Sequence, residues 1–224
     1  MSHKVDFDHY TDDYNTLLQQ QTTFFSPNEK YFARYKVDIV RQRITDPIRS
    51  VLEFGCGIGR NIPFLQKAFP EASITGFDIS EAGLVVAKQE NNGVEFVSDT
   101  DVLTRPFDLV FIAGVFHHVA VSKRAELTSK VFSLVSPKGH LFVFEHNPYN
   151  PVTRRIVSNC PYDADAILLK PKELRGTLET AFFSVEKSGY CLFIPPRLSL
   201  LAPLEDMLHW LPLGGQYWVH ARRE

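Results

Sequence analysis

The segment Val51-Leu52-Glu53-Phe54-Gly55-Cys56-Gly57-Ile58-Gly59-Arg60-Asn61 decides the fold class. It reads as a short apolar strand with an acidic residue near its end, then three glycines at every second position, then a helix. Glycine has no Cβ, so such a loop can bend sharply and bring bare backbone N–H groups close to a ligand. A parallel-sheet nucleotide-binding fold needs a loop of this kind at its first strand-to-helix turn.

The glycine spacing separates this loop from the dinucleotide-binding one. Dinucleotide folds use G-x-G-x-x-G, whereas Gly55, Gly57 and Gly59 are two residues apart. With Glu53 before it, the loop resembles the first motif of the class I S-adenosylmethionine (SAM) dependent methyltransferases. The alternatives are a glycine-rich turn that only packs a helix, and a nicotinamide-dependent Rossmann oxidoreductase. The second is disfavoured by the glycine spacing and by the lack of a Tyr-x-x-x-Lys pair in the sequence.

A second acidic residue follows the next apolar strand, Ser73–Phe77. Asp78 lies 19 residues after Gly59, where a carboxylate can accept hydrogen bonds from a ribose diol. Ser80 is placed to cap the following helix. The alternative role of Asp78 is only to open that helix at its positive end.

The resemblance extends over about Val51 to Glu145. In the family an acid after the third strand contacts the adenine amino group, which matches Asp99, with Asp101 as the alternative. The resemblance also implies SAM as cofactor, with S-adenosylhomocysteine (SAH) as its product. It places the following further residues beside the cofactor: Cys56, Ile79, Thr100 and Ala113.

Residues Phe7 to about Ile44 are predicted to be helical and resemble the N-terminal helical cap of small-molecule methyltransferases. The resemblance makes Lys36, 17 residues before Glu53, and Tyr14 candidates for the methionine carboxylate of SAM. Glu53 would face the cofactor's amino group. The alternative for Lys36 is a solvated charge on the helix surface.

Strands and helices alternate along the chain, which implies a mostly parallel sheet covered on both faces. The predicted strands are Ser50–Phe54, Ser73–Phe77, Val94–Val97, Phe107–Ala113, Gly139–Glu145, Ser184–Phe193 and Gln216–Ala221. The predicted helices after the cap are 59–68, 80–91, 122–135, 172–182 and 198–210. The fold class is therefore α/β: a Rossmann-like, seven-stranded sheet with one antiparallel strand near the C-terminus and an N-terminal helical cap.

One domain is expected, in four parts. They are a helical cap (1–46), a cofactor-binding core (47–146), an acceptor lid (147–171) and the completion of the sheet (172–224). The lid should be irregular, because Pro148 and Pro151 interrupt it. Within it, Tyr149 and Tyr162 suit a cover over an acceptor. The neighbouring pair Arg154-Arg155 would bind an anionic acceptor group or remain solvated.

Candidate acid–base residues follow the fourth and fifth strands, where ligands bind in such sheets. An oxygen nucleophile loses a proton as it is methylated, so a general base helps. His146 is the preferred base, and His118 is the second candidate or a residue that holds a loop. Glu145 is a third candidate, or it orients His146 or a loop amide.

The same residues, with His117, offer nitrogen and oxygen donors of the kind that zinc uses. Adjacent histidines at a helix start usually point in different directions, so we expect no metal site.

Composition excludes several classes of function. The 224 residues are 44% hydrophobic and 22% charged with a net charge of −2, so no basic field directs the chain to nucleic acid. Three scattered cysteines fit a reducing cytoplasm, and no apolar segment reaches the length of a membrane span. The expected partner is a small-molecule acceptor, methylated on an oxygen of a polar, sugar-like or phenolic metabolite. The alternatives are carbon alkylation of a lipid or quinone-like acceptor and a non-catalytic SAM-binding module.

Overall fold

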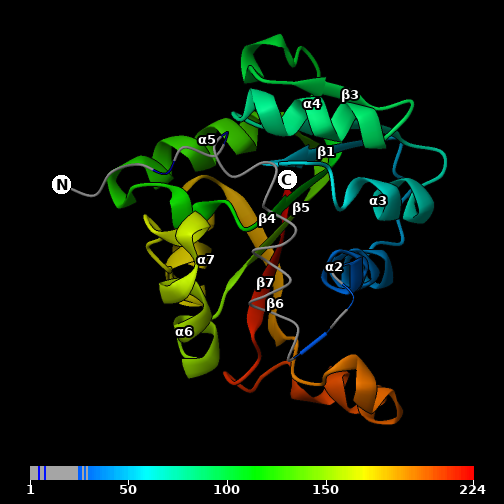
Figure 1. Ribbon diagram of the computed structural model, residues 1–224. Coiled ribbons are helices and arrows are strands. Elements are labelled where there is room, and N and C mark those ends of the chain that lie inside the picture. The colour runs from blue at the N-terminus through cyan, green and yellow to red at the C-terminus, as the bar shows by residue number, and fades with distance from the viewer. Residues whose placement is uncertain (1–4, 6–7, 9–24, 27, 29) are drawn as a thin grey trace.

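A single seven-stranded sheet forms the centre of the molecule (Figure 1). The computed structural model describes residues 5, 8, 25, 26, 28 and 30–224. The strands are β1 (Ser50–Phe54), β2 (Ser73–Phe77), β3 (Glu95–Val97), β4 (Phe107–Ala113), β5 (Val135–His146), β6 (Phe183–Cys191) and β7 (Gln216–Arg223). Their order is β3-β2-β1-β4-β5-β7-β6, and β7 runs antiparallel to both neighbours. The predicted architecture is confirmed.

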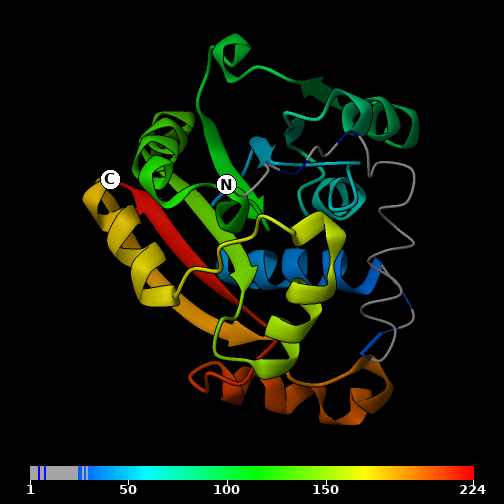
Figure 2. The same cartoon turned by 60° about the vertical axis from the view of Figure 1, so that its left-hand side comes forward.

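Helices cover both faces of this sheet. They are α2 (Lys30–Arg43), α3 (Ile62–Ala68), α4 (Glu81–Glu90), α5 (Arg124–Leu134), α6 (Pro151–Asn159) and α7 (Pro171–Thr180). Short 3₁₀ segments are η2 (Thr100–Val102), η3 (Phe116–His118), η4 (Val121–Lys123), η5 (Pro161–Asp163) and η6 (Pro196–Leu208). Figures 1 and 2 show α2 and α3 on one side of the sheet and α5 and α7 on the other.

Alternate side chains of the central strands build two separate cores. On β1, Val51 packs into the core under α2, α3 and α4, whereas Leu52 packs into the core under α5 and α7. On β4, Phe111 packs into the first of these cores and Ile112 into the second. Because both faces are buried, most residues of these strands are apolar, without the alternation of a half-exposed strand. Their carboxyl ends are thereby fixed in position relative to one another.

The turn after β2 begins α4 as predicted. The Ser80 side chain accepts a hydrogen bond from the Gly83 N–H at 2.9 Å, so Ser80 is the N-cap. Its hydroxyl also donates to Asp8 at 2.6 Å. Val5, three residues earlier, donates its N–H to Asp165 at 3.1 Å. The described residues of the N-terminal segment therefore contact both α4 and the predicted lid.

The predicted lid contains regular structure, contrary to the expectation. Pro151 is in the first turn of α6, where backbone N–H groups have no acceptor within the helix. Proline, which lacks an N–H, therefore costs the helix no hydrogen bond at this position. The Asn150 side chain accepts from the Val152 and Thr153 N–H groups at 2.8 Å and 3.0 Å and so caps the helix. Proline begins this helix instead of breaking it.

Two other elements differ from their predictions. Strand β5 begins at Val135, earlier than the predicted Gly139: Val135 pairs with Phe107, and the register then shifts before His140 pairs with Leu109. The helix predicted over 198–210 is 3₁₀ (η6) and has a kink at Leu198. Of the cap predicted from Phe7 to Ile44, α2 is observed, and residues 9–24 lie outside the described part. Within that part, no helix combines the length and the apolar character that a membrane span requires.

Candidate functional site

One large cavity lies where β1, β2, β4 and β5 end. Its volume is about 1,230 Å³. Single-ligand pockets usually have about 300–1,000 Å³, so this cavity has room for a cofactor and a second molecule. We call the part formed by Gly55, Gly57 and Asp78 the cofactor side. The part formed by His117, His118 and His146 is the histidine side.

The glycine loop forms the wall of the cofactor side. Gly55 and Gly57 have φ angles of +80° and +51°. A Cβ on Gly55 would come 2.3 Å from a methyl carbon of Val115, so glycine lets this loop meet the one after β4. A Cβ on Gly57 would meet nothing within 4 Å and would occupy open space beside the cavity. That is the close approach expected of a cofactor loop.

The structure places Gly59, a predicted cofactor residue, against helix α4. It does not line the cavity. At φ +78° its Cβ would come 2.7 Å from the Asn91 side chain and 3.2 Å from Ala87. The third glycine therefore lets the loop pack against α4.

Asp78 lies at the cavity wall, held by two backbone amides. Its carboxylate accepts from the Gly57 N–H at 2.7 Å and from the Ser80 N–H at 2.9 Å. Burial raises the pKa of this carboxyl, and these hydrogen bonds oppose the rise. Each carboxylate oxygen has further lone-pair capacity for a ribose hydroxyl.

Glu53 lies behind the wall and carries an unsatisfied oxygen. Its Oε1 accepts from the Asn61 side chain at 2.5 Å, while Oε2 is buried with no hydrogen-bond partner. Burial raises the pKa of Glu53 to about 8. Lys36 lines the cavity, and burial, then the charge of Arg60, lowers the pKa of Lys36 to about 8. An acid and a base thus lie at the end of the cavity where the amino-acid part of SAM is expected.

The remaining cofactor predictions divide into three groups. Those that line the cavity are Cys56, Ile79, Thr100 and Ala113. Asp99 does not: it is exposed and accepts the Asp101 N–H at 2.8 Å as the cap of η2. Asp101 pairs with Lys130 at 2.7 Å. Tyr14 lies outside the described residues.

Glu145 holds the loop after β4. It is 1% exposed and accepts the Val115 and Phe116 N–H groups at 3.0 Å and 2.7 Å. Its other oxygen accepts from His117 Nδ1 at 2.6 Å. Burial disfavours the carboxylate, but the His117 charge holds the pKa of Glu145 below its usual range. Of its predicted roles, the structure supports the orientation of loop amides.

Replacing Glu145 should destabilise the fold. In Glu145→Ala, two loop amides and a buried imidazole lose their acceptor, which should cost about 3–5 kcal/mol of unfolding free energy. Denaturant unfolding monitored by circular dichroism measures this. Glu179→Ala, an exposed change on α7, is the control and should stay within about 0.5 kcal/mol of wild type. Equal stability of Glu145→Ala and wild type would contradict this role.

Of the three histidines of the cavity, one is charged at neutral pH and two are neutral. Burial favours a neutral His117, but the carboxylates of Glu145 and Asp163 outweigh it and raise the pKa of His117 to about 10. Burial, then the positive charge on His117, lowers the pKa of His146 to about 4. The same two causes lower the pKa of His118, which bonds Asp165 at 2.9 Å through Nδ1. At neutral pH, His146 and His118 are therefore neutral and His117 is protonated, and the lowered pKa makes His146 a weaker base than an ordinary histidine.

Sequence reasoning missed the acidic residues of the lid. Asp163 and Asp165 line the cavity beside Tyr162. The sequence signal that could have identified them is the pair of aspartates two residues apart in Cys160-Pro161-Tyr162-Asp163-Ala164-Asp165. Arg154 and Arg155 are exposed and lie outside the cavity lining. Tyr149 is 48% exposed and does not line it either.

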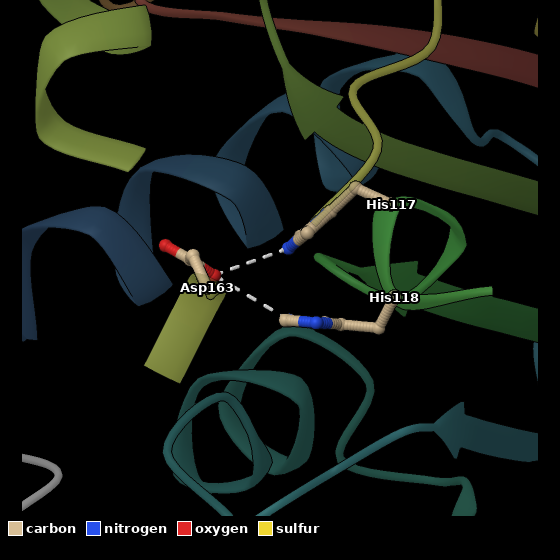
Figure 3. A group of neighbouring side chains, drawn as sticks. All are labelled: His117, His118 and Asp163. Atoms are coloured by element: carbon tan, nitrogen blue, oxygen red, sulfur yellow. Dashed lines mark ion pairs between the residues drawn. The ribbon is translucent and has the colours of Figure 1, made fainter. Parts of the chain in front are cut away.

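The expectation that His117 and His118 point in different directions is wrong for their Nε2 atoms. Each lies 3.5 Å from the same oxygen of Asp163 (Figure 3).

Comparisons with known proteins agree with this geometry. Residues 52–141 match the family model of the methyltransferase domain. The chain is 32% identical over 106 residues to trans-aconitate 2-methyltransferase of Acidovorax sp. (strain JS42), covering 45% of this chain and 40% of that protein. A SAM-dependent methyltransferase from Archaeoglobus fulgidus has a TM-score of 0.69 at 19% identity, over 94% of this chain and 100% of the other. A magnesium protoporphyrin IX methyltransferase from Synechocystis PCC 6803, solved with SAH, has a TM-score of 0.65 at 18% identity, over 98% and 100%.

The sequence of residues 52–141 therefore matches a methyltransferase domain, and the chain has the fold of solved methyltransferases whose cofactor is SAM. The open space at Gly57 and the orphaned Glu53 oxygen fit this cofactor. The chain spans 25–40% of the length of the curated relatives that it matches first.

Proposed function

We propose that the chain transfers the methyl group of SAM to an oxygen of a small, polar acceptor. One observation carries this proposal: a single cavity joins the glycine loop and Asp78 to His146 and its neighbours. A cofactor on the first side has its reactive end directed to the second, where an acceptor has room. The loop after β4, fixed by Glu145, forms the boundary between them.

His146 is the proposed base. In the reaction, an oxygen lone pair of the acceptor forms the new C–O bond while the C–S bond breaks and its electron pair stays on sulfur. SAM would supply the methyl group and leave as SAH, and His146 would take the acceptor proton and pass it to solvent. His146 ends β5 and lines the cavity beside His117, with their ring centroids 4.9 Å apart. His118 is the second candidate.

The histidine side favours a polar acceptor over a lipid. Besides its three histidines, it includes Asp163 and Asp165. Leaving such groups facing an alkyl chain would cost their hydration without replacing it. The names of the relatives do not decide this point, since one is named for trans-aconitate and another for phthiotriol and phenolphthiotriol dimycocerosates.

Asp78→Ala should weaken SAH binding by about ten- to a hundredfold, as expected for a lost charge-assisted contact. Isothermal titration calorimetry with SAH measures it. The comparison variant is Asp99→Asn, which should change the affinity less because this side chain is exposed and outside the cavity lining. If Asp78→Ala binds SAH as wild type does, the carboxylate does not hold the ribose.

The activity itself is tested with SAM and a panel of phenolic, sugar-like, carboxylate and lipid acceptors, with SAH formation as the readout. SAH should form with at least one polar acceptor. Turnover with lipid acceptors alone would contradict the polar acceptor. Tight SAM binding with no turnover on any panel member would favour the non-catalytic module.

A further inference from the structure

The histidine side contains a compact group of three side chains from segments distant in the sequence. His117 and His118 belong to η3, and Asp163 ends η5. Their side chains are 2%, 10% and 9% exposed, and all three line the cavity. Figure 3 shows His117 and His118 reaching toward the Asp163 carboxylate from the loop after β4. Among the described residues, this is the group whose donor atoms are close enough to hold an ion.

The distances within the group suit a shared ion. His117 Nε2 and His118 Nε2 each lie 3.5 Å from Asp163 Oδ1, and the three donor atoms lie within 4.8 Å of one another. A good N–H···O hydrogen bond is about 2.7–3.2 Å long, so these contacts are loose ones. Two ligands at about 2.0–2.1 Å from a tetrahedral zinc ion are separated by about 3.4 Å. The observed separation matches two ligands of one ion better than two hydrogen bonds.

Both histidines also carry the outer contacts that metal-binding histidines have. His117 Nδ1 lies 2.6 Å from Glu145, and His118 Nδ1 lies 2.9 Å from Asp165. A ligating histidine usually donates its second ring N–H to a carboxylate or carbonyl, which fixes the ring and makes the free nitrogen a better ligand. Here each ring has such a carboxylate at Nδ1 while its Nε2 faces Asp163. An ion would displace the Nε2 proton that His117 carries at neutral pH.

We propose that His117, His118 and Asp163 bind one divalent transition-metal ion of the zinc type. Two imidazoles and a carboxylate suit zinc, iron or cobalt, whereas magnesium and calcium prefer oxygen ligands alone. Three protein ligands leave a position open, as in catalytic metal sites. Because all three ligands line the cavity, that position would take an oxygen of a hydroxyl or carboxylate acceptor. This last step alone rests on the proposed function.

The test is a titration of zinc chloride into the untagged full-length protein after removal of metal with a chelator. Calorimetry should show one ion bound per chain with a Kd in the micromolar range or below. His118→Gln and Asp163→Asn should each weaken binding at least tenfold. The controls are His209→Gln and Asp206→Asn, an outlying pair 3.0 Å apart, and both should bind zinc as wild type does.

Cobalt substitution gives a readout that does not depend on the folding of a variant. Cobalt(II) bound to wild type in four- or five-coordination should give strong visible absorption bands that zinc then removes. The absence of these bands, the absence of zinc binding by wild type, or equal binding by wild type and both site variants would overturn the proposal. In those cases the group is an ion-pair network.

SAH binding separates this proposal from the proposed function. Chelation should leave the SAH affinity of wild type unchanged, because the ion lies on the histidine side. Zinc binding without SAH binding would refute the proposed function and keep the metal site. SAH binding and turnover without zinc binding would refute the metal site and keep the proposed function.

Discussion

Gly57→Val should abolish SAH binding while the protein remains folded. Wild type and variant should differ at least about a hundredfold in Kd, or about 2.7 kcal/mol. The valine side chain would occupy the open space beside Gly57, into which the cofactor has to fit. The φ of +51° adds backbone strain, because β-branched residues rarely adopt it. Calorimetry with SAH, together with a thermal melt of each protein, measures both effects.

Gly93→Val is the matched control for this experiment. Gly93 also has a positive φ, +73°, and a Cβ there would also meet nothing within 4 Å. It precedes β3 and does not line the cavity. The two variants should lose similar stability, and only Gly57→Val should lose SAH. Tight SAH binding by a folded Gly57→Val protein would refute the role of the loop.

His146→Ala should lower turnover by about a hundred- to ten-thousandfold, the usual contribution of a general base. The Kd for SAH should stay close to that of wild type, because the base acts on the acceptor's proton and not on the cofactor. Single-turnover kinetics with the acceptor found in the panel measure the first effect, and calorimetry measures the second.

His118→Ala is the informative comparison. It removes the other neutral histidine of the cavity, so the two variants show which ring accepts the proton. Normal turnover by His146→Ala would assign the base to His118, or would show that the nucleophile is already ionised. A parallel loss of SAH binding would instead give His146 a structural role.

Local sequence patterns predicted the first half of the fold best. The bounds of β1, β2 and β4 are as predicted, because each is a short segment rich in apolar residues that is followed directly by a glycine or an aspartate. The start of β5 was missed because its first pair, Val135 with Phe107, depends on a strand far away in the sequence. The Pro137-Lys138-Gly139 sequence is typical of a turn, but in the structure it forms an irregular part of β5.

The cofactor side was more predictable than the histidine side for the same reason. Gly55, Gly57 and Asp78 follow strands directly, so their place at the strand ends follows from the order of elements. The contacts of Glu145 with the loop amides, and of Asp163 with His117, join segments that only the folded chain brings together. No spacing within one segment reveals them. The packing role of Gly59 against α4 is likewise a tertiary contact.

The most direct test of the central claim is a crystal structure of the protein with SAH. We expect adenosine beside Gly57, with its ribose hydroxyls on Asp78, and the sulfur atom directed to the histidine side. The space next to His146 should remain accessible to an acceptor. SAH bound elsewhere, or with its sulfur directed away from His117 and His146, would refute the assignment of the two sides of the cavity.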